Sequence, residues 1–163
     1  RSAEVIGGLS SKAKLINQVA DRSLVDRRER SLRDVVEGAI GSVHEDDPGA
    51  PIDVDVPAVT VRADPALEEA ITELLRNAIE HGGPDVTVRV GHVDEDAIYG
   101  EDDGPGIPAE RHEEVFEPGH SSTSGGTGFG LTIVKRITEA HGWTVSVTDG
   151  PEGGARFELV MFQ

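Results

Sequence analysis

Apolar residues recur at three- and four-residue spacing in four parts of the chain, which is the pattern of a helix that buries one face. The third of these stretches carries the strongest start signal. Asp64 is a candidate N-cap, Pro65 follows at the first helical position, and acidic side chains occupy the first turns. Glycines and a proline end the pattern after His81. The predicted helices span about 9–25, 32–40, 64–81 and 131–140.

Alternation of apolar and polar residues predicts short strands between and after these helices. Residues 27–30 are expected to form a charged link, and a short helix is expected near 109–115. This order of elements predicts an α+β fold, a two-layer sandwich in which helices pack on one face of a mixed, mostly antiparallel sheet. The predicted strands span 52–56, 59–62, 86–90, 97–101, 143–148 and 155–161.

Composition narrows the function classes. Acidic residues number 31 against 15 basic ones, a formal net charge of −16, which excludes nucleic-acid binding through a basic surface. The absence of cysteine excludes disulfides and thiolate metal sites. No apolar run is long enough to span a membrane, so we expect a cytoplasmic chain without direct membrane contact. Only three of the bases are lysines and the acids are dispersed, which indicates a halophile rather than an acidic partner-binding arm.

Two glycine-rich segments have a composition suited to ligand binding. Residues 102–108 follow a predicted strand, and residues 125–131 precede a predicted helix. Closely spaced glycines let the backbone approach a ligand, and the amides at a helix N-terminus favour an anion such as phosphate. Neither segment is a Walker A loop, because no Gly-Lys-Ser/Thr closes it, and neither opens a Rossmann βαβ unit. Taken alone, each is equally well explained as an ordinary loop.

Glu73 and Asn77 are four residues apart on the third predicted helix, so their side chains share a face. Leu74 and Leu75 between them point to the core. A carboxylate and an amide oxygen on one face can hold a hydrated Mg²⁺ or orient a nucleophile. The alternative is a solvated pair with no ligand.

Together and in this order, these segments resemble the nucleotide-binding domain of sensor histidine kinases, within the family shared with gyrase, Hsp90 and MutL. The resemblance implies a Bergerat-type sandwich and covers roughly residues 32–162. Four ordered motifs carry it: residues 73–81 are similar to the N box, 101–108 to the G1 box, 114–118 to the F box and 126–131 to the G2 box.

The resemblance implies a role for each matching residue. Asn77 would ligate the Mg²⁺ that bridges the phosphates of ATP, and Asp102 would accept a hydrogen bond from the adenine amino group. Gly104 and Gly106 would let the chain turn beneath the base, and residues 108–127 would form the ATP lid. Glu73 would orient or activate the acceptor imidazole. The remaining residues of the nucleotide site would be His81, Ile107, Phe116, Gly126, Thr127, Gly128, Phe129, Gly130 and Leu131.

Two departures from the family pattern remove expected phosphate-neutralising cations. Glu80 stands where many members carry a lysine, and residues 121–123 read Ser-Ser-Thr where a common lid pattern ends in lysine. Arg76, His81 and His120 are the candidate replacements. The resemblance therefore supports binding of ATP or ADP more strongly than it supports catalysis.

The resemblance also implies a division of the chain. Residues 1–31 would be the helical remnant of a dimerisation region, and residues 32–163 the ATP-binding catalytic domain. The chain begins with Arg1 rather than Met, so we expect a piece of a longer sensor, with the acceptor helix upstream and a response regulator reached through that parent. Whether the parent is membrane-anchored is left open.

None of the histidines is expected to be the phosphoacceptor. His44 precedes a predicted loop, whereas the family's acceptor lies inside a long helix. His92, His112 and His141 are expected to face solvent. The fragment is therefore predicted not to label itself with phosphate. Two other functions stay open: an anti-sigma-type serine kinase of the same family, and a degenerate module that senses ATP without phosphotransfer.

Overall fold

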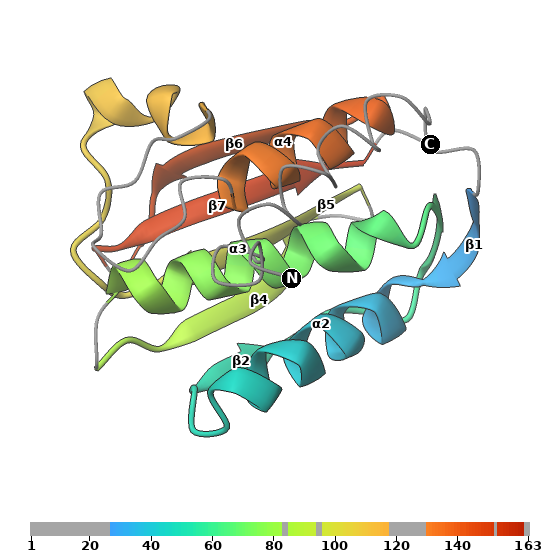
Figure 1. Ribbon diagram of the computed structural model, residues 1–163, viewed down its shortest axis with the longest axis horizontal. Coiled ribbons are helices and arrows are strands. Elements are labelled where there is room, and N and C mark those ends of the chain that lie inside the picture. Colours follow the sequence, from blue (N-terminus) through green and yellow to red (C-terminus); the bar gives the residue numbers. More distant parts are fainter. Residues whose placement is uncertain (1–26, 83–84, 94–95, 118–129, 152, 162–163) are drawn as a thin grey trace, which may run out of the picture.

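The computed structural model describes residues 27–82, 85–93, 96–117, 130–151 and 153–161 (Figure 1). Three helices form one layer of the molecule. They are α2 (Leu32–Asp46), α3 (Ala66–Gly82) and α4 (Gly130–Ala140). The helix α3 lies between the other two and contacts both, and the layer covers one face of a sheet (Figure 1).

The sheet has five strands in the order β2-β4-β5-β7-β6. Only the β2–β4 pair is parallel, and the other three pairs are antiparallel. The strands are β2 (Ile52–Val54), β4 (Val88–Val93), β5 (Ala97–Asp102), β6 (Thr144–Asp149) and β7 (Ala155–Val160). This architecture confirms the predicted α+β sandwich with a mixed, mostly antiparallel sheet.

The apolar residues that set the periodic patterns lie between the two layers. Alternate residues of β7, such as Phe157 and Leu159, are buried. Leu67, Ile71 and Leu75 of α3 are buried as well, each at most 2% exposed. Burial of this apolar area on one face of each element provides the main stabilisation of the sandwich.

The structure corrects the expected charged link at residues 27–30. Residues Arg28–Ser31 form a strand, β1, which pairs antiparallel with β3 (Thr60–Ala63) in a separate two-stranded sheet. The Arg30 side chain reinforces the pairing, because its Nε donates to the Ala63 carbonyl oxygen at 2.7 Å. An arginine-rich segment has no strong strand signal of its own, so its partner strand decides its conformation.

The second helix is longer than its apolar pattern predicts. It begins after Ser31, whose hydroxyl accepts the Asp34 amide at 3.4 Å, and continues to Asp46 rather than ending near Ile40. His44 therefore lies in the last turn of α2, where its Nε2 is 3.0 Å from the Ala50 carbonyl oxygen. Within the described residues, no helix combines the length and the apolar character needed to cross a membrane. Residues 1–26 lie outside them, so the division of the chain at residue 31 stays a prediction.

Candidate nucleotide site

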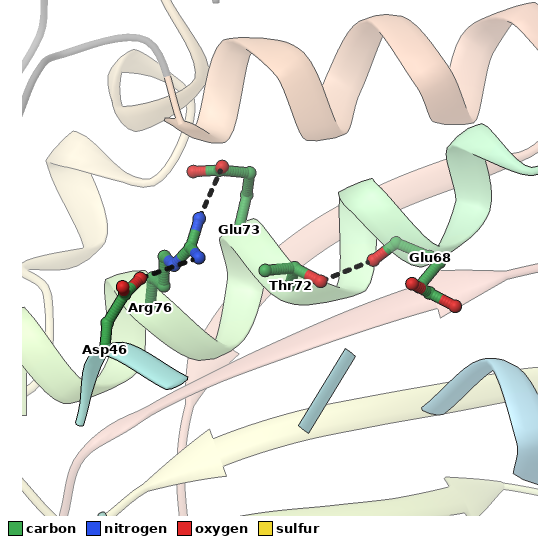
Figure 2. Close-up of polar contacts among 5 residues, drawn as sticks. All are labelled: Asp46, Glu68, Thr72, Glu73 and Arg76. Atoms are coloured by element: carbon green, nitrogen blue, oxygen red, sulfur yellow. Dashed lines mark hydrogen bonds and ion pairs between the residues drawn. The ribbon is translucent and has the colours of Figure 1, made fainter. Parts of the chain in front are cut away.

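The central helix α3 carries the first group of predicted site residues. Its start matches the expected cap, since the Asp64 carboxylate accepts the Ala66 amide at 2.9 Å, although the helix begins one residue after Pro65. A second local bond on this helix runs from the Thr72 hydroxyl to the Glu68 carbonyl oxygen at 2.8 Å (Figure 2).

Glu73 is buried, with 3% of its surface exposed, on the side of α3 that faces the start of α4. A Cβ placed on Gly130, the first residue of α4, would lie 3.0 Å from Glu73 Oε1. Residue 130 is also the last glycine of the predicted phosphate cradle. The fold therefore brings the predicted catalytic carboxylate to the helix N-terminus at which phosphates are expected to bind.

Arg76 connects this carboxylate to the neighbouring helix (Figure 2). Its Nη1 lies 3.6 Å from Glu73 Oε2, and its Nη2 donates to Asp46 Oδ2 at 2.9 Å. Sequence reasoning missed Asp46, because a contact between residues 30 positions apart leaves no periodic signal. Arg76, a candidate for a missing phosphate cation, is instead held between two carboxylates.

Asn77 and His81 follow Glu73 at successive turns of α3, as the spacing predicts. Asn77 is half-buried, and its side chain makes no hydrogen bond with a described residue. Nδ1 of His81 is buried and likewise has no hydrogen-bond partner among the described residues. No cluster of three or more His, Cys, Asp or Glu side chains suited to a metal ion occurs in the described part of the chain.

Asp102 occupies the last position of β5 and is 3% exposed. Its Oδ1 accepts the amide of Gly104 at 2.9 Å and the amide of Ala155 at 3.4 Å. Both bonds fall on one oxygen, so Oδ2 is not used by a described donor. The turn and the adjacent strand thus fix the orientation of the carboxylate and leave one acceptor for a ligand.

Each of the two glycines of the predicted G1 turn is required for a different structural reason. A Cβ on Gly104 would lie 2.5 Å from the Cα of Gly82, so only a glycine lets the turn approach the end of α3. Gly106 has φ +80°, a left-handed conformation that side chains disfavour. The turn after β5 is therefore packed directly against the end of the helix that carries Asn77.

The predicted F box is anchored to the domain rather than free at the surface. Phe116 is buried and makes an edge-to-face contact with Phe157, with ring centroids 6.0 Å apart. Its carbonyl oxygen accepts the Thr132 hydroxyl at 3.0 Å. Ile107 and Leu131 are buried in the same apolar cluster. The buried cluster thus anchors the F box to the domain. Two 3₁₀ turns, Ala109–Arg111 and Glu114–Phe116, replace the expected short helix.

Part of the predicted site lies outside the described residues. This part comprises the lid from residue 118 onward, His120, Gly126, Thr127, Gly128 and Phe129. Of the predicted phosphate cradle, the structure describes Gly130 and Leu131. The roles of the others stay predictions.

A cavity of about 380 Å³ lies near the C-terminal ends of α2 and α3. None of the predicted site residues lines it, so we do not assign it to the nucleotide. Its lining residues are Asp47, Gly49, Ala50, Pro51, Ile79, Glu80 and Val86.

The structure corrects the expectation that His112 and His141 face solvent, whereas His92 is exposed as expected. His112 is half-buried, and its Nε2 lies 2.8 Å from the Ile107 carbonyl oxygen. His141 is 4% exposed and stacks on Trp143 with ring centroids 4.3 Å apart. The Asp64 amide donates to Nε2 at 3.0 Å, so the ring proton sits on Nδ1 and is donated to the Ile137 carbonyl oxygen at 2.8 Å. Burial lowers the pKa of His141 from its ordinary value. His141, directly after α4, thus holds the backbone of Asp64, the residue that caps α3.

Comparison with known proteins decides the family. The family model described as "Histidine kinase-, DNA gyrase B-, and HSP90-like ATPase" matches residues 63–163. The chain belongs to this family. The matched range contains Glu73, Asn77, Asp102 and the G2 segment, so the resemblance inferred from the motifs is confirmed.

Curated relatives of this ATPase domain are sensor histidine kinases. The chain is 34% identical over 156 residues to the sensor histidine kinase GtrS of Pseudomonas aeruginosa, which covers 89% of this chain and 27% of GtrS. It is 37% identical over 102 residues to the sensor histidine kinase CpxA of Escherichia coli, which covers 58% of this chain and 22% of CpxA. The chain therefore spans about a quarter of the length of these relatives.

Solved structures agree with the family and the fold. The mycobacterial sensor histidine kinase MprB matches with a TM-score of 0.73 and 26% identity, over 82% of this chain and 97% of that structure. The ATP binding domain of PrrB from Mycobacterium tuberculosis matches with a TM-score of 0.70 and 26% identity, over 83% of this chain and 96% of that structure. Both matches agree with the two-layer sandwich and with the family.

Proposed function

We propose that the chain is the catalytic domain of a sensor histidine kinase, which transfers the γ-phosphoryl group of ATP to a histidine on a dimerisation helix of the parent protein. The observation that carries this proposal is the pair of buried carboxylates at the ends of one site. Asp102 lies at the end of β5, and Glu73 lies beneath the first residue of α4. Each is 3% exposed. Each is oriented by the protein, Asp102 by two backbone amides and Glu73 by Arg76, and Asp102 Oδ2 accepts from no described donor.

Asp102 would select adenine. Its Oδ1 is occupied by two backbone amides, and its Oδ2 would accept a hydrogen bond from the exocyclic amino group of the base. Guanine presents a carbonyl oxygen at the corresponding position, which would repel the carboxylate. The site would therefore bind ATP and ADP in preference to GTP and GDP.

Asn77 would hold Mg²⁺ together with the phosphates. Magnesium in nucleotide sites keeps several waters and takes only one or two oxygens from the protein, the rest coming from phosphate. An amide oxygen that makes no hydrogen bond with a described residue fits that requirement. The ion would supply neutralisation of the phosphate charge. Gly130 and Leu131 would direct the N-terminus of α4 at the same phosphates.

Glu73 would orient the acceptor imidazole and accept its proton as the phosphorus–nitrogen bond forms and the bond between the γ-phosphorus and the ADP leaving group breaks. Phosphoryl transfer depends mainly on positioning and on charge stabilisation, so a base held in one place by its surroundings suits the task. The buried position of Glu73 on a regular helix restricts its side chain in this way.

The cellular context is part of the proposal. The kinase relatives support a parent sensor whose acceptor histidine would pass the phosphoryl group to a response regulator. We place the domain in the cytoplasm, where ATP is available. The dispersed negative charge, −16 in total, supports an origin in a halophile.

The decisive experiment mixes this chain with the separately purified acceptor helices of the parent kinase and γ-labelled Mg-ATP. We expect acid-labile labelling of the acceptor and none of the chain itself. Asn77→Ala should abolish labelling through loss of Mg²⁺, whereas Glu73→Gln should slow transfer with little change in ATP affinity. Glu68→Gln is the matched control for Glu73→Gln, because Glu68 is an exposed carboxylate on the same helix.

The outcomes separate the competing functions. Acid-stable label on a serine of a partner would indicate the serine kinase instead. Tight ATP binding without transfer to any acceptor would indicate an ATP-sensing module. Strong acid-labile self-labelling that is removed by His44→Ala would contradict the placement of the acceptor outside this chain.

A further inference from the structure

We propose that Arg76 is the positioning residue for Glu73 and that Asp46 anchors Arg76. Arg76 would keep the Glu73 carboxylate directed at the reacting atoms, and it would not serve as the missing phosphate cation. This inference rests on the proposed kinase function, because it assigns Glu73 the role of the base.

The geometry of Arg76 supports this role (Figure 2). Glu73 and Arg76 lie three positions apart on α3, a spacing that brings side chains together on a helix surface. One terminal nitrogen of the guanidinium lies 3.6 Å from Glu73, and the other donates to Asp46 at 2.9 Å. The planar guanidinium can contact two carboxylates at once with different nitrogens, which the single ammonium of a lysine does less well.

The burial of the three side chains shows which contact matters for the chemistry. The Asp46 side chain is 71% exposed, so its pair with Arg76 contributes little free energy by itself. Its effect is geometric, because it fixes the direction of the guanidinium. The Glu73 side chain is 3% exposed, and a buried carboxylate depends strongly on a nearby positive charge. Loss of Arg76 would therefore remove the positive charge that orients the Glu73 carboxylate, and the carboxylate would turn away from the reacting atoms.

The same contacts argue against a phosphate role for Arg76. Its guanidinium is directed toward α2 through Asp46, which is the last residue of that helix. A phosphate ligand would have to displace one of two carboxylates that already neutralise the charge. Asp46, which anchors Arg76, thus lies on α2, whereas Glu73 and Arg76 lie on α3.

The test measures binding and transfer separately. Nucleotide affinity is measured by calorimetry with ATP and with ADP, and the transfer rate is measured at saturating ATP with the acceptor helices. We expect Arg76→Gln to slow transfer at least about tenfold, since general acid–base catalysis contributes about 10²–10⁴-fold. Affinity for either nucleotide should change by less than about threefold, because no contact with the phosphates is lost. Arg76→Lys should restore part of the rate, and Asp46→Asn should slow transfer less than Arg76→Gln.

Double variants separate positioning from an independent contribution. In a Glu73→Gln background, Arg76→Gln should slow transfer no further, and in an Arg76→Gln background Asp46→Asn should have no effect. Two controls remove a charge elsewhere: Glu45→Gln on the exposed side of α2, and Arg89→Gln on the exposed side of β4. Both should transfer at the unaltered rate.

A third measurement does not depend on transfer. The side-chain carboxyl ¹³C resonance of Glu73, identified by its loss in Glu73→Gln, should shift in Arg76→Gln and shift less in Asp46→Asn. It should stay in place in Glu45→Gln. An unmoved resonance in Arg76→Gln overturns the proposal even if the kinase function is correct. If the resonance shifts in Arg76→Gln but the unaltered chain binds ATP and transfers to no acceptor, the proposed kinase function is rejected. The contact between Glu73 and Arg76 is then still supported. A loss of ATP affinity much larger than the loss of ADP affinity would assign Arg76 to the γ-phosphate.

Discussion

Replacing the Asp102 carboxylate by an amide tests the assignment of the nucleotide base most directly. In Asp102→Asn the amide oxygen can keep the bonds from the Gly104 and Ala155 amides, which both reach Oδ1 at present. The new NH₂ group then takes the place of Oδ2. It would face the adenine amino group, so two hydrogen-bond donors would oppose each other where the carboxylate accepts a hydrogen bond.

The expected loss follows from the chemistry of that one bond. A hydrogen bond to a charged group contributes about 1.5–3 kcal/mol, and an unsatisfied buried donor costs about 1–3 kcal/mol. A net loss of about 1–3 kcal/mol corresponds to an affinity for Mg-ADP lowered about 5- to 150-fold. The fold itself should change little, because both bonds from the protein are kept. We expect a change in the free energy of unfolding within about 1 kcal/mol.

Calorimetry with Mg-ADP and Mg-GDP at one salt concentration measures the effect. The introduced side-chain amide would be able to donate to the guanine carbonyl oxygen. In Asp102→Asn the affinity for Mg-ADP should therefore fall and the affinity for Mg-GDP should rise, so the preference for adenine becomes smaller. Asp103→Asn controls for the change in net charge, since Asp103 is exposed and its side chain accepts, among the described residues, only the Thr87 amide at 2.8 Å. Unchanged ADP affinity in Asp102→Asn, or an equal loss in Asp103→Asn, would refute the adenine assignment.

Three further predictions concern stability and packing. Burial lowers the pKa of His141 in the folded state, so the unfolded chain binds the proton more readily, and stability should be full above about pH 6.5 and fall as the pH drops below it. Urea unfolding at pH 7.5 and 5.5 checks this, and His141→Gln, which can still accept the Asp64 amide, should show a smaller pH dependence; an equal dependence would contradict it. Gly104→Ala should destabilise the domain by about 1–3 kcal/mol and weaken ADP binding, because its Cβ would meet the backbone of Gly82. Gly100→Ala is its control, since nothing lies within 4 Å of a Cβ there, and the assignment fails if both variants melt alike. The melting temperature should rise between 0.1 and 2 M KCl, because the charge of −16 is screened over about 3 Å at 1 M salt; a flat or falling curve would argue against a halophile.

The sequence by itself determined the elements that carry the site and the faces they present. Helical periodicity requires Glu73 and Asn77 to share one side of α3 and Leu75 to point to the core, and the structure has them there. The same holds for Asp102, which the strand expected over 97–101 and the glycine turn after it put at a strand end. These properties depend on residues within a few positions of one another, so the amino-acid sequence alone specifies them.

Tertiary structure alone decided the contacts between distant segments. The arginine-rich segment of β1 is a strand because it pairs with β3. His141 is buried where it can accept a hydrogen bond from the Asp64 amide, 77 positions away. The pairing of Arg76 with Asp46 joins two helices across 30 positions. Such contacts depend on how the layers pack and on which polar groups lose water there, and no local periodicity records either.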